Sequence, residues 1–259
     1  MKIQLIRSAS LRIVYDGKEI WVDPMFAEAG AYPPIPNTAN PRNNPLVDIP
    51  LELDLLPTPD AIMLTHGHPD HFDTAAAERI PKDTPFFCQP EDRDTLVGQG
   101  FTNVSPIEDA AEWNGIRMYR TGGRHGTGVI GEQMGPVSGF VLRSELEPTL
   151  YLAGDTIWCE ETEEAVRRFD PSVMVCYAGD ACFLEGGPII MNKEDVERAA
   201  LAAPRTRLLV AHLEAWNHCA LSREELKRYL QERQLLARVD IPADGEEIDY
   251  PMNEPMDAK

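Results

Sequence analysis

The sequence predicts an α/β fold in a single domain, on three observations. The chain has 259 residues, a length typical of one of the larger α/β domains. From about residue 60 onward, short apolar runs with strand character alternate with runs of helical character. No change in composition divides the chain into two parts. We therefore expect strand layers with helices outside them over residues 1–259.

The N-terminal part is expected to form three short strands followed by a long loop. The strands should cover residues 3–7, 11–15 and 20–22. Asp16-Gly17, between the last two, is a strong hairpin signal. Residues 26–59 lose this periodicity and are rich in Pro and Asn. Because ordered loops of this length often lie over functional sites, we expect a lid or cleft wall near the active site rather than a disordered insertion.

After this loop, strands and helices are expected in alternation. The expected strands cover residues 61–66, 85–89, 116–123, 138–144, 149–155, 172–180, 207–215 and 238–243. The expected helices cover residues 73–80, 91–100, 160–169, 193–203 and 222–233. The last of these helices begins with Ser222 and has Glu225 three residues later, which is the pattern of a capping box.

Composition excludes several classes of function. The formal net charge of −19 repels polyanions, so we expect a small-molecule substrate and no nucleic-acid partner. No apolar run is long enough to span a membrane, and the N-terminus has the alternation of a strand rather than the apolar core of a signal peptide. The five cysteines include no CxxC pair, which favours reduced thiols and a cytoplasmic location. Homo-oligomer formation is left open.

One short stretch, MLTHGHPDHFD at residues 63–73, contains three of the six histidines of the chain. His66 and His68 are two positions apart after an expected strand, so both imidazoles can point to one metal ion. Asp70 and His71 stand at the start of the next helix and are directed to a different point. The alternative, a chance cluster of polar loop residues, is much rarer than a metal-binding motif.

Two metal ions need more ligands than this stretch supplies. His125 lies in the glycine-rich stretch TGGRHGTG, where the backbone can approach a small site closely. Asp155 and His212 each end an expected strand, and open α/β folds gather their chemistry at strand ends. Taken singly, His125 would be an ordinary loop histidine and Asp155 a turn residue. Together with the HxHxDH stretch, they indicate a metal site.

These motifs, with VDP before them and RHG, AGDT and AHLEA after them, resemble the metallo-β-lactamase superfamily. Within it, the sequence is similar to the metal-dependent hydrolase branch that includes the L-ascorbate-6-phosphate lactonase. The resemblance implies a four-layer αβ/βα sandwich with two metal ions at one edge. It implies the first ion on His66, His68 and His125, and the second on Asp70, His71 and His212. Asp155 would bridge both ions, and Asp23 would hold the HxHxDH loop by hydrogen bonds.

Imidazole and carboxylate ligands without a thiolate suit two divalent ions, with Zn first and Mn or Fe as alternatives. Two such ions about 3.5 to 4 Å apart can share a water and lower its pKa toward neutrality. We therefore expect a metal-bridged hydroxide that attacks a small-molecule ester, lactone, amide or phosphodiester. Asp155 would orient this hydroxide, with Asp70 beside it among the catalytic residues.

Residues that face the substrate are harder to identify from sequence. His218 follows the expected ligand His212 by six positions and could protonate a leaving group or grip the substrate, although a plain loop histidine is the alternative. Arg42 and Arg124 could meet a phosphate or carboxylate, although solvated surface arginines are commoner. Two other functions stay open: an iron-dependent redox enzyme on the same scaffold, and a catalytically idle metabolite-binding protein.

Overall fold

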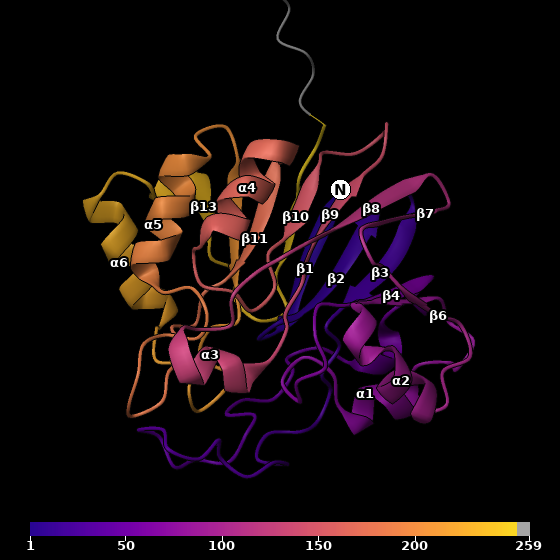
Figure 1. Ribbon diagram of the computed structural model, residues 1–259, viewed down its shortest axis with the longest axis horizontal. Helices are drawn as coiled ribbons and strands as arrows, with labels where there is room; N and C mark the ends of the chain where they lie inside the picture. The colour runs from indigo at the N-terminus through magenta and orange to yellow at the C-terminus, as the bar shows by residue number, and fades with distance from the viewer. Residues whose placement is uncertain (253–259) are drawn as a thin grey trace, which may run out of the picture.

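The structure is a computed structural model that describes residues 1–252, and within them two seven-stranded sheets form the centre of the molecule (Figure 1). In spatial order, the first sheet consists of β14 (Glu247–Asp249), β1 (Lys2–Arg7), β2 (Ser10–Tyr15), β3 (Lys18–Val22), β4 (Ala61–Leu64), β5 (Phe86–Cys88) and β6 (Val104–Pro106). The second sheet consists of β13 (Val239–Asp240), β12 (Arg207–Ala211), β11 (Val173–Tyr177), β10 (Leu150–Leu152), β9 (Gly139–Arg143), β8 (Ile116–Thr121) and β7 (Ala110–Trp113).

Both sheets combine an antiparallel part with a parallel part. In the first sheet, β1, β2 and β3 pair antiparallel, and β3 to β6 pair parallel. In the second, β7 to β10 pair antiparallel, and β10 to β13 pair parallel. The predicted hairpin lies between β2 and β3, where Asp16 and Gly17 both have positive φ values, 52° and 70°, as a tight two-residue turn requires.

Three apolar layers hold the sandwich together. Side chains from the inner faces of both sheets form the central core, with Leu11 and Leu209 among its fully buried members. A second layer joins the β7–β13 sheet to α4 (Glu160–Phe169), α5 (Lys193–Ala202) and α6 (Arg223–Glu232). A third joins the first sheet to α1 (Thr74–Arg79) and α2 (Arg93–Gly98). The predicted four-layer αβ/βα sandwich is therefore confirmed, with helices outside both sheets (Figure 1).

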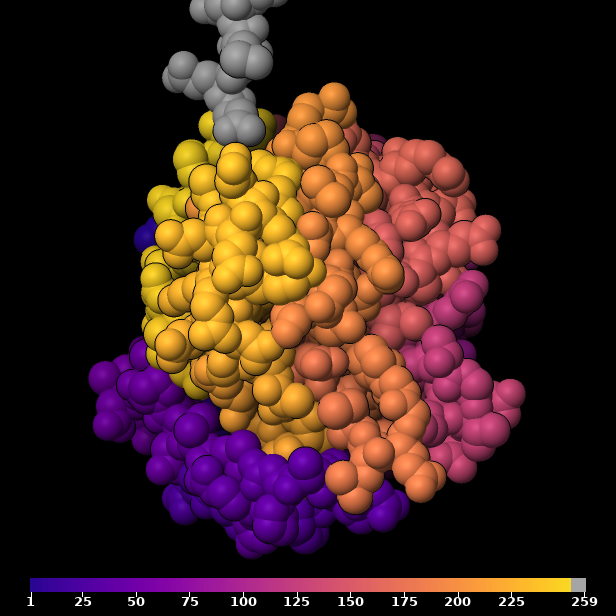
Figure 2. Space-filling view, turned by 90° about the vertical axis from the view of Figure 1, so that its left-hand side faces the viewer, coloured from indigo at the N-terminus to yellow at the C-terminus, as the bar shows by residue number. Residues whose placement is uncertain are grey.

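The long segment 26–59 is tied to the rest of the molecule by buried polar groups. Tyr32 and Asn44 pair as an isolated β-bridge, and a short 3₁₀ helix, η1, covers Leu53–Leu55. The guanidinium of Arg7 is fully buried and donates hydrogen bonds of 3.0–3.1 Å to the carbonyls of Met25, Ala27 and Val47. Burial lowers the pKa of Arg7 to about 10. The segment forms the indigo and violet base of the molecule in Figure 2.

Three predicted elements need correction. Residues 128–134 form helix α3 (Gly128–Met134) between the expected strands 116–123 and 138–144, where no helix was expected, because its two glycines and short length hide the helical pattern. The last expected strand, 238–243, is reduced to β13 after a 3₁₀ helix, η3 (Leu236–Arg238). The polar end of the chain contributes β14, which pairs with β1. Over residues 1–252, none of the helices has the length and apolar character that a membrane crossing requires.

Candidate metal centre

The parallel strands place the predicted ligands at one edge of the sandwich. His66 and His68 follow β4, Asp155 follows β10, and His212 follows β12 directly. Because the carboxyl ends of parallel strands within a sheet lie at the same edge, these side chains converge although they are far apart in sequence. His125 joins them from the segment between β8 and α3.

The converging side chains fall into two groups. Within each group, the potential ligand atoms all lie within 4.8 Å of one another. One group contains His66, His68 and His125, and the other contains Asp70, His71, Asp155 and His212. Six of the seven residues are buried, and His68 is partly exposed. The resemblance implied the same sets of histidines and Asp70, with Asp155 shared between them, and the structure groups Asp155 with the second set.

Asp155 lies between the two groups. Its Oδ1 is 3.2 Å from Nε2 of His71, and its Oδ2 is 3.6 Å from Nε2 of His212. The same Oδ2 is 3.8 Å from Nε2 of His125, which belongs to the other group. One carboxylate therefore faces imidazoles of both groups, as a bridging ligand would.

Hydrogen bonds orient the histidines through the nitrogen that faces away from the centre. His71 Nδ1 lies 2.9 Å from Asp23 Oδ2, and this carboxylate also accepts hydrogen bonds of 2.8 Å from the amide and the hydroxyl of Thr65. His125 Nδ1 lies 2.8 Å from the carbonyl of Ile189, an acceptor that requires this nitrogen to carry the proton. Such contacts fix the ring orientation and leave Nε2 for a metal ion.

His212 has partners that the sequence did not indicate. Its Nδ1 lies 3.4 Å from Cys219 Sγ and 3.5 Å from Ser8 Oγ, and its backbone amide donates to the carbonyl of Ser8 at 2.7 Å. The residue adopts a left-handed φ of 64°, which is uncommon for a side chain of this size. Local strain held by surrounding hydrogen bonds is frequent at functional sites.

The donor set fits a divalent metal ion. In the part of the chain that the structure describes, His71 Nε2, Asp155 Oδ1 and His212 Nε2 are buried without a hydrogen-bond partner, and all three belong to the second group. Unpaired buried polar atoms are costly and rare, so their concentration at one point indicates a missing ligand. The atoms are nitrogens and carboxylate oxygens, which Zn, Mn and Fe all accept.

The charges at the centre are strongly coupled. Burial by itself would lower the pKa of His71, but the carboxylates of Asp155 and Asp23 outweigh it and raise this pKa to about 10. The pKa of His212 is also raised, against burial, chiefly by Asp155. Burial would raise the pKa of Asp155, but His71 and His212 hold it well below its usual range. Without metal, these imidazoles therefore bind protons where a divalent ion would sit.

A family model described as a beta-lactamase superfamily domain matches residues 19–213 of the chain. The chain belongs to the beta-lactamase superfamily. UPF0173 protein YddR of Bacillus subtilis is 37% identical over 254 residues, which cover 96% of this chain and 100% of that protein. A UPF0173 metal-dependent hydrolase of Rubrobacter xylanophilus is 23% identical over 255 residues, which cover 95% and 96% of the two chains.

The chain is also similar to two solved structures. The isothiocyanate hydrolase from Delia radicum gut bacteria has a TM-score of 0.92 and 36% identity, covering 96% of this chain and 99% of its own. A possible metal-dependent hydrolase from Veillonella parvula has a TM-score of 0.92 and 34% identity, covering 96% and 98%. The predicted superfamily and enzyme class, a metal-dependent hydrolase of the metallo-β-lactamase fold, are confirmed. The finer similarity to the L-ascorbate-6-phosphate lactonase stays a prediction.

The structure also places His218 close to the candidate metal centre. Its Nε2 lies 3.8 Å from Asp70 Oδ2, and its Nδ1 is buried with no hydrogen-bond partner in the described residues. Burial lowers the pKa of His218 to about 4. The side chain is therefore close to the ligands but belongs to neither group of ligand atoms.

The two arginines considered as substrate contacts have other partners. Arg124 is exposed and forms a 3.0 Å ion pair with Glu161 at the start of α4. Arg42 is exposed and donates to the carbonyl of Leu46 within its own loop. In residues 1–252, neither guanidinium has a hydrogen bond or ion pair with the ligand groups.

Proposed function

We propose that the chain hydrolyses a small uncharged molecule with an electrophilic carbon, such as an ester, a lactone or an isothiocyanate, and that it uses two divalent metal ions. One observation carries this proposal: the Asp155 carboxylate lies between two adjacent groups of buried His and Asp ligand atoms. Zn is the first candidate for both ions, with Mn and Fe as alternatives.

In this proposal, His66, His68 and His125 would hold one ion, Asp70, His71 and His212 would hold the other, and Asp155 would be shared between them. Bound there, the ions would supply an activated water and stabilise the negative charge that develops on the substrate. Asp155 would also orient this water, because its Oδ2 is directed to imidazoles of both groups. Asp23 and Thr65 would keep the His71 ring in place during the reaction.

The preference for an uncharged substrate rests on charge and on similarity. The chain carries a net charge of −19, and both candidate arginines are exposed and make other contacts. A phosphodiester would therefore meet repulsion without a placed cation. The isothiocyanate hydrolase that is 36% identical supports an uncharged electrophilic carbon.

His218 is proposed to contact the leaving group. In isothiocyanate hydrolysis, the water oxygen bonds to the central carbon, the carbon–nitrogen bond breaks, and the nitrogen takes up both protons of water to leave as an amine beside carbonyl sulfide. A side chain beside the ligands but outside both sets can guide a proton to that nitrogen. His218 is such a group, because its Nε2 lies 3.8 Å from Asp70 Oδ2 and its Nδ1 is buried without a hydrogen-bond partner among residues 1–252.

The proposal is tested by loading purified protein separately with Zn and Mn and measuring hydrolysis of an ester, a lactone, a phosphodiester and benzyl isothiocyanate. We expect the protein to hydrolyse the uncharged carbon compounds. Chelator treatment should abolish this activity, and His66→Ala should reduce it by at least about 100-fold. His218→Gln should lower kcat while bound metal stays unchanged. Metal-loaded protein that hydrolyses none of the carbon compounds would contradict the proposal and would favour the redox or the binding alternative.

A further inference from the structure

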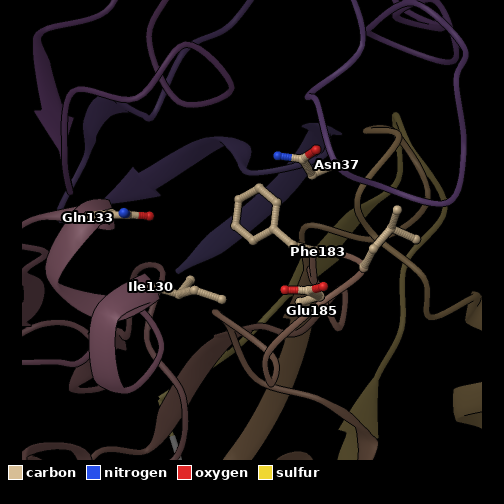
Figure 3. Close-up of a pocket in the computed structure, with 6 residues that line it drawn as sticks. Asn37, Ile130, Gln133, Phe183 and Glu185 are labelled. Atoms are coloured by element: carbon tan, nitrogen blue, oxygen red, sulfur yellow. The ribbon is translucent and has the colours of Figure 1, made fainter.

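A cavity of about 390 Å³ lies between α3, the segment after β11 and the 26–59 loop. Its lining residues are Asn37, Ile130, Gln133, Phe183, Leu184 and Glu185. Figure 3 shows the Phe183 ring lying between Asn37 and Ile130. The volume falls in the range of pockets that bind small molecules.

The cavity and the ligands share one apolar wall. Ile130 and Phe183 pack against a buried cluster that includes Ile189, and Cys219 packs against the same cluster. The carbonyl of Ile189 is 2.8 Å from Nδ1 of the ligand His125. Cys219 Sγ is 3.4 Å from Nδ1 of the ligand His212. The wall of the cavity is therefore connected to one histidine of each group of ligands, through Ile189 and Cys219.

The lining selects against anions. Ile130, Phe183 and Leu184 are apolar, Asn37 and Gln133 are neutral, and the charged member is Glu185. Within the described residues 1–252, no Lys or Arg lines the cavity. An anionic group would meet the carboxylate of Glu185 without a compensating cation, whereas a hydrocarbon group would gain apolar contact.

The 26–59 loop closes one side of the cavity. The amide of Leu184 donates to the carbonyl of Asn37 at 2.7 Å. Asn37 belongs to a stretch that is held by Asn217, whose side chain bonds to Ile35, Thr38 and Asn40. Asn217 stands next to His218, so the same loop connects the cavity wall to the metal centre.

We propose that this cavity binds the uncharged alkyl or aryl tail of the substrate, while the reacting carbon lies at the metal ligands. The second part of this inference, that the reacting carbon lies at the metal ligands, rests on the proposed function. Phe183 and Leu184 are then the residues that determine tail specificity, and Glu185 rejects tails that end in a carboxylate.

The kinetic test compares methyl isothiocyanate with hexyl isothiocyanate on the metal-loaded full chain. Each buried methylene is expected to raise kcat/KM by about twofold to fourfold, so hexyl should exceed methyl by at least about tenfold. Leu184→Glu should lower this ratio by at least about fivefold, because it places a second carboxylate at the cavity. Leu201→Glu is the matched control, since Leu184 and Leu201 are both exposed, at 69% and 62%, and Leu201 lies in α5. The same hexyl-to-methyl ratio of kcat/KM in Leu184→Glu and Leu201→Glu would overturn the proposal.

A binding measurement separates failure of the tail site from failure of the proposed function. Ligand-observed NMR with 1-hexanol, which has the tail but no reactive carbon, needs no turnover. We expect saturation transfer to 1-hexanol and none to methanol, with the hexanol signal reduced in Leu184→Glu and kept in Leu201→Glu. Activity without hexanol binding would overturn the tail site alone. Hexanol binding without hydrolysis of any isothiocyanate or ester would overturn the proposed function and leave the cavity as a tail site.

Discussion

Nε2 of His71 and Oδ1 of Asp155 lie 3.2 Å apart, and over residues 1–252 neither of these buried atoms has a hydrogen-bond partner. On its other side, the His71 ring contacts Asp23 at 2.9 Å. An imidazole between two carboxylates is stabilised in its protonated form, and its pKa is raised to about 10 after the opposing effect of burial. A metal ion on Nε2 must displace that proton.

We therefore predict that metal binding releases protons and strengthens as pH rises. Below a pH of about 10, metal-free His71 holds a proton that Zn has to expel, and His212, whose pKa is also raised, adds to the effect. For each proton released, the apparent affinity should rise by about tenfold per pH unit between pH 6 and 8. Calorimetric titration of chelator-treated protein in buffers of different ionisation enthalpy measures this release. The same heat in every buffer would contradict it.

Asp23→Asn should weaken metal binding without removing a ligand. The carboxylate fixes the His71 ring and the Thr65 backbone by three contacts of 2.8–2.9 Å, and the amide cannot accept all of them. We expect a loss of about 10-fold to 100-fold in metal affinity, measured by competition with a chromogenic chelator. Asp60→Asn is the control, because that exposed carboxylate accepts one hydrogen bond from Glu19 far from the centre. Equal affinities in the two variants would show that Asp23 does not support the site.

Arg7→Met should destabilise the fold by releasing the 26–59 loop. Three carbonyls would each lose a charged donor, and the buried position offers them little water. The free energy of unfolding should fall by about 2–4 kcal/mol in urea denaturation. Arg42→Met removes an exposed arginine that makes one 3.3 Å bond in the same loop, and should cost less than about 0.5 kcal/mol. Protection of the 26–59 backbone amides from hydrogen exchange should fall in Arg7→Met and should be unchanged in Arg42→Met.

The candidate metal centre could largely be predicted from sequence, because most of its candidate ligands lie in one short motif or directly after strands. His66 and His68 share one loop, and His212 follows an apolar run that became β12. Helix α6 was also predictable, since Ser222 Oγ accepts from the amide of Glu225 as the capping pattern indicated. These features are local, so residue order and spacing carry the information.

What could not be predicted depends on contacts between distant segments. Ser8 and Cys219 meet at His212 only after β1 and β12 are placed in their sheets, and neither residue type marks such a role. Two residues that line the cavity come from elements of this kind. Ile130 lies in α3, a short helix with two glycines, and Phe183 lies in an irregular segment. Arg124 was a reasonable substrate contact beside His125, but its side chain turns to Glu161 instead.

The most direct test of the central claim is anomalous diffraction at the Zn edge from crystals of the protein grown with Zn. The account predicts two peaks, one among His66, His68 and His125 and one among Asp70, His71 and His212, with the Asp155 carboxylate touching both. Peaks that lie away from these side chains, or full Zn occupancy in an Asp155→Ala, His66→Ala double variant, would contradict it.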